Sequence, residues 1–438
     1  MSPHLSRLPP GPTDRLARSF LYFVRIEAMA GAALLASTLI ALCLANSAWS
    51  EEFLALWETR LGFTAGPGQV SRSLKHWIND GLMTLFFFVI SLELKRELVL
   101  GELRSPRMAA LPIAAALGGM VVPVAVFLLL GQSQHQSMHG WGTVMSTDTA
   151  FVIGCLAALG TRVPGSLRLF LLSLAIFDDI GAILVVAIAY GDPLSWTALG
   201  AAGIALALTA GLARLGIRST AVYIALGAAV WLAFDASGVH ATVAGVILGL
   251  MTPSRRWVSD TRLRAILRRV IAHPPDEHWN SDRAARGDLH RAGVAAREAL
   301  SPIERLELGL HPWVAFIVLP LFALANAGVP ITSARIDTGL AYAIGAAFVI
   351  GKPLGIVLFT FLAVRLRIAI LPPALRWRML VPGSILAGIG FTMALFIAEL
   401  AFDADSVASA KLGVLVASVI CAVVGLSALL LATRTRGR

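Results

Sequence analysis

Two adjacent aspartates in the middle of an apolar run place the strongest constraint on how this chain can fold. Asp178 and Asp179 lie near the centre of residues 169–190, which are otherwise almost all apolar. A run of about twenty apolar residues can cross the ~30 Å hydrocarbon core of a bilayer as an α-helix. A charged side chain at the centre of such a helix costs about 2.5–3.5 kcal/mol on insertion scales. We therefore expect the pair to face the interior of a membrane protein and to serve a function there.

The composition supports this interpretation. Of the 438 residues, 57% are hydrophobic and 14% are charged, whereas a soluble domain carries about 25% charged residues. The three cysteines all lie in apolar runs, so neither a disulfide framework nor a metal cluster follows from them. We expect an all-α polytopic membrane protein with about twelve transmembrane helices.

Apolar runs of about 17–25 residues predict where the chain crosses the membrane. The eighth run is shorter than the others. The predicted spans are 26–46, 76–98, 108–131, 142–160, 169–190, 195–213, 219–235, 240–252, 312–330, 338–363, 380–401 and 409–433.

The distribution of lysine and arginine predicts the orientation of these spans. With the N-terminus in the cytoplasm, 30 of the 36 Lys and Arg residues fall in cytoplasmic segments, five fall outside, and Lys352 remains inside a span. This bias is the positive-inside pattern. Both termini, 1–25 and 434–438, are therefore expected in the cytoplasm, on either side of one transmembrane domain of residues 26–433. The net charge of +10 then reflects topology and contact with anionic lipid, and nucleic acid is not an expected partner.

The loop 47–74 is expected to face the periplasm. It contains an amphipathic stretch, 51–60, and a Gly66-Pro67-Gly68 turn between two short extended pieces. Two interpretations stay open. The segment is either an ordinary surface loop or a hairpin whose edge pairs with a second copy of the chain in a homodimer.

The segment 253–306 is a long cytoplasmic insertion. Apolar residues at helical spacing alternate with four arginines over residues 260–272, a pattern typical of a basic helix lying on the cytoplasmic leaflet. Further on, Ser301-Pro302-Ile303-Glu304 has the N-cap serine, the proline and the glutamate that predict a helix start.

Ionisable residues inside the predicted spans divide into two groups. The first group lies near span ends, where a side chain can reach the headgroups. These residues are Asp80, Asp235 and Glu399. The second group lies about half a span from either interface, where that explanation fails and a function is expected. These residues are Asp148, Asp178, Asp179 and Lys352.

The spacing of the two aspartates argues against a catalytic pair. Neighbours on a helix project about 100° apart, so Asp178 and Asp179 do not converge on one water molecule. The Gly-x-Gly-Asp sequence of intramembrane aspartyl proteases does not occur in the chain. A better partner is Ser146-Thr147-Asp148-Thr149, where three hydroxyl residues flank an acid and offer oxygen ligands to a hard cation.

Two further features are a lysine in the middle of the tenth span and a glycine-rich eleventh span. Lys352 lacks the sequence neighbours of a phosphate loop and is expected to pair with a buried aspartate or to be uncharged. Gly388 and Gly390 predict a break in the eleventh helix, because Gly costs about 1 kcal/mol relative to Ala in a helix interior. With a second break near Asp148 in the fourth span, spans 3–5 and 10–12 would form an inverted repeat with two discontinuous helices.

Charged residues also cluster where the second span reaches the cytoplasm. Glu93, Arg96 and Glu97 end that span, and Glu307 lies just before the ninth. Two interpretations stay open: an interface cluster that serves topology, and a proton-responsive gate whose acids and bases titrate together.

Eight motifs occur in order along the chain. They are Trp77-Ile-Asn-Asp80, Leu92-Glu-Leu-Lys-Arg-Glu-Leu98, Thr147-Asp-Thr-Ala-Phe151, Phe177-Asp-Asp-Ile-Gly-Ala182, Ser237-Gly-Val-His-Ala-Thr242, Leu310-His-Pro-Trp-Val314, Gly351-Lys-Pro-Leu-Gly355 and Gly388-Ile-Gly-Phe-Thr-Met393. Together they closely resemble the NhaA family of bacterial Na⁺/H⁺ antiporters. The sequence departs from the family in two places: the insertion 253–306 is longer than the family norm, and Thr149 stands where an aliphatic residue is usual.

The resemblance implies a role for each of these residues. Na⁺ would bind at Asp178 and Asp179, and Lys352 would pair with one of them or balance the charge. Asp148, with Thr147, would lie where the two broken helices cross. The pH-sensing positions would be Glu93, Arg96, Glu97, Glu307 and His240.

The resemblance also implies the activity and its setting. The chain would be a transporter of the bacterial inner membrane and not an enzyme, moving Na⁺, Li⁺ and H⁺ without a cofactor. Na⁺ (or Li⁺) and H⁺ would compete for the same buried carboxylates during alternating access, in an electrogenic and pH-regulated exchange. Two alternatives remain: a passive cation channel, and an intramembrane aspartyl hydrolase that uses Asp148 with Asp178 or Asp179.

Overall fold

The computed structural model describes residues 23–434, except 66–67, 100, 102–104, 132–134, 192, 217–218, 273–282, 332–335 and 374. Almost all of the predicted N-terminal segment 1–25 therefore lies outside the described residues. The same is true of residues 435–438 and of the first two residues of the predicted Gly66-Pro67-Gly68 turn.

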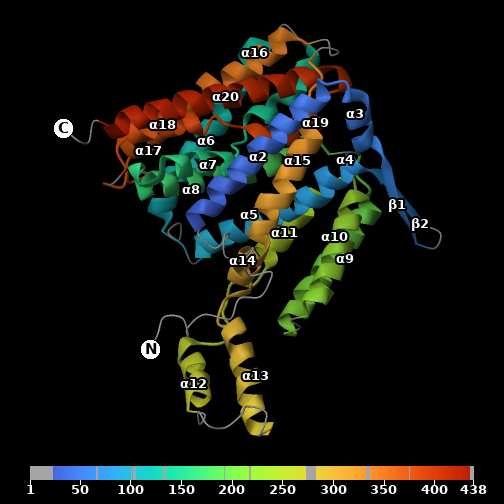
Figure 1. Cartoon of the computed structure of the whole chain (residues 1–438), viewed down its shortest axis with the longest axis vertical. Coiled ribbons are helices and arrows are strands. Elements are labelled where there is room, and N and C mark those ends of the chain that lie inside the picture. Colours follow the sequence, from blue (N-terminus) through green and yellow to red (C-terminus); the bar gives the residue numbers. More distant parts are fainter. Residues whose placement is uncertain are drawn as a thin grey trace.

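The described chain is an all-α bundle with one small hairpin, which confirms the predicted fold class (Figure 1). Among the described residues, eight helices are long and apolar enough to cross a membrane, and two bent helix pairs raise the number to ten. Two shorter apolar helices, Ala221–Asp235 and Thr242–Met251, fall on the seventh and eighth predicted spans. Twelve crossings and the inverted repeat stay predictions.

Much of the described bundle consists of eight α-helices. In chain order these are α2 (Phe23–Ala45), α5 (Met83–Val99), α6 (Pro106–Leu130), α8 (Gly165–Ala189), α9 (Trp196–Arg214), α10 (Thr220–Asp235), α11 (Thr242–Met251) and α20 (Ala404–Arg434).

Three helices contain a turn of π-helix, in which the backbone holds one residue more than an α-turn. The first joins α4 (Leu74–His76) through η1 (Trp77–Leu82) to α5. The second joins α14 (Pro302–Trp313) through η6 (Val314–Val318) to α15 (Leu319–Asn326). The third joins α16 (Thr338–Ala346) through η7 (Ala347–Gly351) to α17 (Lys352–Arg365), so η7 ends directly before Lys352. The predicted capping box at Ser301 and Glu304 is present at the start of α14.

Two helices are interrupted where the sequence predicts breaks, in the fourth and eleventh spans. The 3₁₀ segment η4 (His135–Val144) is followed by residues 145–148, which are not helical, and then by α7 (Thr149–Leu159). The helix α18 (Trp377–Leu386) is separated from α19 (Phe391–Ala401) by residues 387–390, with a bend of 45°.

Helices α6 and α17 cross with their backbones in close contact at Gly118 and Gly355. A Cβ atom added at Gly118 would clash with the carbonyl oxygen of Gly355, and one added at Gly355 would clash with that of Gly118. Small residues allow such contact between membrane helices, where lipid tails provide no hydrophobic driving force. The crossing places Lys352 over Gly119, where an added Cβ would lie 3.8 Å from the lysine Cε.

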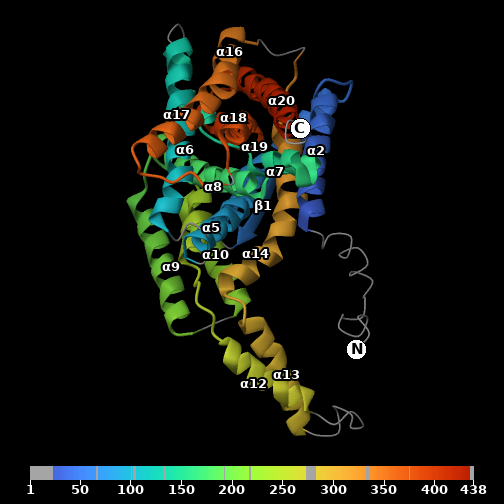
Figure 2. The same cartoon turned by 90° about the vertical axis from the view of Figure 1, so that its left-hand side faces the viewer.

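Two segments lie outside the bundle. The helix α3 (Ser50–Glu58) leads into an antiparallel hairpin of β1 (Arg60–Ala65) and β2 (Gly68–Ser73), which extends from one side of the bundle (Figure 1). The insertion 253–306 contributes α12 (Asp260–Ile271) and α13 (Arg283–Glu298), which pack together and project away from the other helices (Figure 2). The expected position of α12 on the lipid leaflet stays a prediction.

The α6–α17 crossing generates a stability prediction. Gly355→Ala should lower the free energy of unfolding by about 1–3 kcal/mol, the usual cost of overpacking, because the new methyl group meets a backbone carbonyl. Gly345→Ala is the matched control, since a Cβ at Gly345 in α16 meets nothing within 4 Å. Thermal unfolding of both purified variants in detergent tests the prediction. Equal stability of the two variants would contradict it.

Candidate functional site

The two helix breaks meet, and Asp148 holds them together. Its Oδ1 accepts a hydrogen bond from the backbone N–H of Phe151 (2.9 Å), which caps α7. Its Oδ2 accepts from the N–H of Thr392 (2.9 Å) and from the hydroxyl of the same residue, in the first turn of α19. One buried carboxylate thus lies at two helix N-termini, where the positive ends of the helix dipoles stabilise negative charge.

The non-helical backbone on the two sides of the crossing is also hydrogen-bonded. The N–H of Asp148 donates to the carbonyl oxygen of Ile389 (2.7 Å), and the Thr147 hydroxyl lies 3.0 Å from the carbonyl oxygen of Ala387. Inside a membrane each freed peptide group needs such a partner. The breaks are therefore an ordered part of the structure.

The glycines of the second break are required by close packing. A Cβ at Gly388 would lie 2.8 Å from the carbonyl oxygen of Phe348, and a Cβ at Gly390 would lie 2.5 Å from the Phe348 ring. Neither glycine has a positive φ. Both let the break pack against η7, the segment that precedes Lys352.

Asp178 and Lys352 form a fully buried ion pair beside the crossing. The lysine Nζ lies 3.2 Å from Asp178 Oδ2, and neither side chain is exposed. Nζ also donates to the carbonyl oxygen of Met145 at the first break, and the Thr147 hydroxyl lies 2.7 Å from Asp178 Oδ2. The predicted pairing of Lys352 with a site aspartate is present, and the partner is Asp178.

Asp179 faces a different neighbour, as expected for adjacent residues on a helix. Its Oδ2 accepts a hydrogen bond from the Thr149 hydroxyl (3.3 Å), and only 1% of the residue is exposed. Within the described part of the chain, Asp178 Oδ1, Asp179 Oδ1 and the hydroxyl of Ser146 are buried without a hydrogen-bond partner.

These groups suit a hard monovalent cation better than a transition metal. The described residues contain no group of three or more His, Cys, Asp or Glu side chains placed to hold a metal ion. Asp178 and Asp179 offer carboxylate oxygens, and the hydroxyl oxygens of Thr147 and Thr149 lie beside them. Hard cations prefer oxygen ligands of this type.

The predicted cytoplasmic cluster is partly assembled. Arg96 joins two carboxylates, with one guanidinium nitrogen 2.8 Å from Glu307 Oε1 and another 3.0 Å from Glu97 Oε1. Glu93 lies on α5 one turn before Glu97. His240, the fifth predicted pH-sensing residue, does not join this group.

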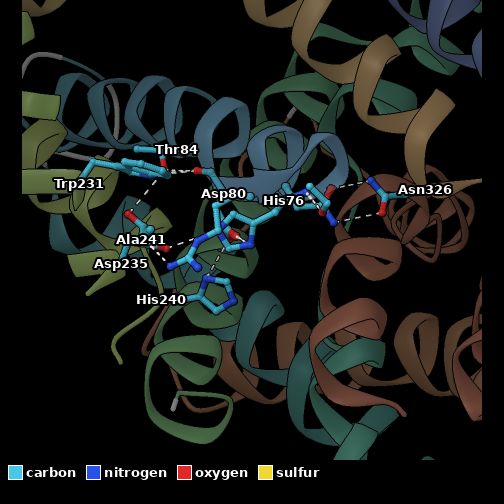
Figure 3. A network of polar contacts seen from close by, with 11 residues as sticks. His76, Asp80, Thr84, Trp231, Asp235, His240, Ala241 and Asn326 are labelled. Atoms are coloured by element: carbon cyan, nitrogen blue, oxygen red, sulfur yellow. Dashed lines mark hydrogen bonds and ion pairs between the residues drawn. The ribbon is translucent and has the colours of Figure 1, made fainter. Parts of the chain in front are cut away.

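His240 belongs instead to a network at the other end of α5, between η1 and the turn from α10 to α11 (Figure 3). Asp80 lies between two histidines, 3.3 Å from His240 Nδ1 and 3.0 Å from His76 Nδ1. The other nitrogen of His76 lies 3.4 Å from Asp235, which also pairs with Arg72 of the hairpin (3.1 Å). This network links the hairpin to α4, η1 and α10.

A second ion-pair network links the C-terminal end of α19 to two other helices. Glu399 lies 2.9 Å from Lys75 Nζ and forms a closer ion pair with Lys411. Lys411 lies within α20 and is 6% exposed. One carboxylate thus joins α4, α19 and α20.

These networks correct three predictions from the sequence. Asp80, Asp235 and Glu399 were expected to extend towards lipid headgroups, and each is instead paired with a basic side chain from another segment. The only sequence signal for these pairs is that Glu399 and Lys411 carry opposite charges near the adjoining ends of consecutive spans.

Thr392 is a site residue that the sequence did not single out, although it lies within a recognised motif. It is 1% exposed and supplies two of the hydrogen bonds to Asp148. Its position two residues after Gly390 places its N–H in the first turn of α19, which is the usual position of an N–H that needs a cap.

Comparison with known proteins gives one consistent match. A family model described as "Na+/H+ antiporter 1" matches residues 22–429. A protein named "Na(+)/H(+) antiporter NhaA" from Rhizobium meliloti (strain 1021) is 67% identical over 438 residues, covering 100% of both chains. "Na(+)/H(+) antiporter NhaA 2" from Acidiphilium cryptum (strain JF-5) is 55% identical over 435 residues, 99% of this chain and 97% of that one. "Na(+)/H(+) antiporter NhaA" from Rhodopirellula baltica is 49% identical over 429 residues, 97% and 96% of the two chains.

The double cap predicts an unusually large loss of stability on truncation of Asp148. Asp148→Ala removes the acceptor of two helix starts and should lower the free energy of unfolding by about 1–4 kcal/mol, twice the usual cost of one cap. Asp337→Ala is the control, because Asp337 caps α16 alone. Denaturant or thermal unfolding in detergent compares the two. A loss at Asp148 no larger than that at Asp337 would show that the crossing does not depend on this carboxylate.

Proposed function

The chain belongs to the Na⁺/H⁺ antiporter 1 family, and from this premise we propose that Asp178 and Asp179 are where Na⁺ and H⁺ compete for binding. The protein is a Na⁺/H⁺ antiporter of the membrane and not an enzyme, so the intramembrane hydrolase considered from the sequence is wrong. The ion site, the mechanism and the pH response belong to this proposal.

The buried pair of Asp178 and Lys352 beside Asp179 is the observation that carries the proposal. When Asp178, Asp179 and Lys352 are all ionised, these three groups carry a single net negative charge in a region without exposed surface. Burying an uncompensated charge is costly. A cation or a proton reduces this cost, and since both act on the same oxygens each excludes the other.

The contacts of Thr147 support a coupling between ion binding at Asp178 and a conformational change at the helix crossing. Its hydroxyl lies within hydrogen-bond distance of both Asp178 and the carbonyl of Ala387 at the second break. A cation that binds Asp178 therefore changes the hydrogen bonding of the Thr147 hydroxyl, which also contacts the helix crossing. We propose that the crossing carries the alternating access, with the site open to one side of the membrane at a time.

The stoichiometry depends on Lys352. Electrogenic exchange of more than one proton for each Na⁺ needs a second group that releases a proton when Na⁺ binds. Lys352 is in contact with Asp178 and can fill this role, or both aspartates can carry the protons while Lys352 balances charge. Both versions use the ion pair of Lys352 and Asp178.

We also propose how pH regulates the antiporter, where it is located and how two copies associate. The group of Arg96, Glu97 and Glu307 supports a pH-responsive gate at the cytoplasmic end, to which Glu93 would contribute. His240 would act at the opposite end, through Asp80. We further propose Li⁺ as an alternative ion, the bacterial inner membrane as the location with both termini in the cytoplasm, and the β1–β2 hairpin as the contact of a homodimer.

The ion-site assignment is tested by Asp179→Asn in inside-out vesicles. Respiration acidifies the vesicles, and a pH-gradient dye then reports the discharge caused by added Na⁺. The unaltered protein should discharge the gradient, whereas Asp179→Asn should lose nearly all of this response, because the amide neither binds a proton nor offers a charge to Na⁺. Asp337→Asn, which keeps an acceptor oxygen at the α16 cap, should discharge normally.

The same assay separates the antiporter from a passive cation channel. A channel would admit Na⁺ without a matching movement of protons. Normal discharge by Asp179→Asn would show that this residue is not part of the ion site.

The ion pair gives a second test, through stability. Lys352→Met leaves Asp178 buried without its cation and should cost about 3–5 kcal/mol, the usual effect of breaking a buried pair. Adding Asp178→Asn should recover most of this loss but not the transport activity. Thermal unfolding of the two single variants and the double variant forms the cycle. Additive losses would mean that the two side chains do not interact energetically.

A further inference from the structure

Asp179 is the least satisfied of the three aspartates near the helix crossing, Asp148, Asp178 and Asp179. Both oxygens of Asp148 accept hydrogen bonds from the helix starts. Asp178 receives the Thr147 hydroxyl and the Lys352 ammonium on one oxygen. For Asp179, the hydrogen bond within the described residues comes from Thr149, while Oδ1 is buried without a partner.

This difference identifies the place where a cation is most needed. A buried carboxylate with a single weak donor remains under-solvated, and the 3.3 Å length of the Thr149 contact is long for an O–H···O bond. A bound cation would remove the deficit at Asp179. At Asp148 a cation would instead compete with hydrogen bonds that hold the fold together.

Thr149 is suited to both states of Asp179. A hydroxyl has one donor and two acceptor positions, so it can donate to the ionised carboxylate or accept from the protonated one. With Na⁺ present, the same oxygen can turn a lone pair towards the ion, as hydroxyl oxygens do for hard cations. Thr149 is also the first residue of α7, directly after the N-cap Asp148, so its backbone is fixed by the crossing.

We propose that Thr149 is a cation-binding residue of the antiporter, supplying a hydroxyl ligand that completes the Na⁺ site at Asp179. This inference rests on the proposed function of Asp179. The residue contributes to cation affinity and leaves the chemistry of proton binding to the aspartates. Its effect therefore falls on the Na⁺ concentration needed for transport, while the maximal rate is set by the movement of the crossing.

The test compares Thr149→Val with Thr149→Ser in the vesicle assay. Valine keeps the shape and the β-branch of threonine but removes the hydroxyl, whereas serine keeps the hydroxyl. The expected result is a rise of about tenfold in the half-maximal Na⁺ concentration for Thr149→Val, equivalent to ~1.4 kcal/mol. The maximal rate should change little. Thr149→Ser should remain close to the unaltered protein.

Thr360→Val is the matched control. Thr360 lies in α17, is fully buried, and its hydroxyl has no hydrogen-bond partner among the described residues. It therefore reports the cost of losing a buried threonine hydroxyl away from the aspartates. An unchanged half-maximal Na⁺ concentration in Thr149→Val, or an equal rise in Thr360→Val, would overturn the proposal.

A binding measurement keeps the test independent of transport. A ligand that binds only the folded protein raises its melting temperature as its concentration increases. Added NaCl, compared with choline chloride at equal ionic strength, should stabilise the purified Thr149→Ser variant as it does the unaltered protein, and should stabilise Thr149→Val only at higher concentration. Equal Na⁺ dependence of the two variants would overturn the proposal. Failure of Asp179→Asn to abolish antiport would instead overturn the ion site itself, so the two failures can be told apart.

Discussion

A backbone that leaves the helix inside a membrane must find new hydrogen-bond partners, and in this protein the Asp148 carboxylate supplies one at each of two helix breaks. Lipid offers nothing to the freed N–H groups at the start of α7 and α19, so each helix start needs an acceptor within the protein. One carboxylate serves both. The charge of that carboxylate is in turn stabilised by the two helix ends that it caps. The two helix starts therefore share one buried acceptor, which links the two interrupted helices.

The proposed ion site is connected to this crossing through short side chains. Thr147 and Thr149 lie on either side of Asp148 and reach Asp178 and Asp179 on α8. Lys352 reaches the same place from α17 and also holds the carbonyl of Met145 at the first break. The groups proposed to bind ions are thus in direct contact with the groups that satisfy the broken backbone. Occupancy at the aspartates and the geometry of the breaks therefore affect each other.

Much of this could be predicted from the sequence because a charge or a glycine within an apolar span is conspicuous. Asp148, Asp178, Asp179 and Lys352 were identified by their depth in the predicted spans, and the glycines of the eleventh span predicted its break. Apart from an aspartate partner for Lys352, the sequence did not reveal which side chains from distant segments pair. Asp80 looks like an interface residue until His76 and His240 are seen on either side of it. Thr392 carries no charge, and its role follows only from the position of Asp148.

The π-turn η7 has a geometric effect on the buried Lys352–Asp178 ion pair. A π-turn accommodates one extra residue, so the chain after it faces about 100° away from the direction that an uninterrupted α-helix of the same sequence would give. Lys352 is the first residue after this turn. The register shift directs its side chain to Asp178, while the glycine contact with α6 fixes how close the helix can lie. The direction of the positive charge at the site is therefore set by one surplus residue in the preceding backbone.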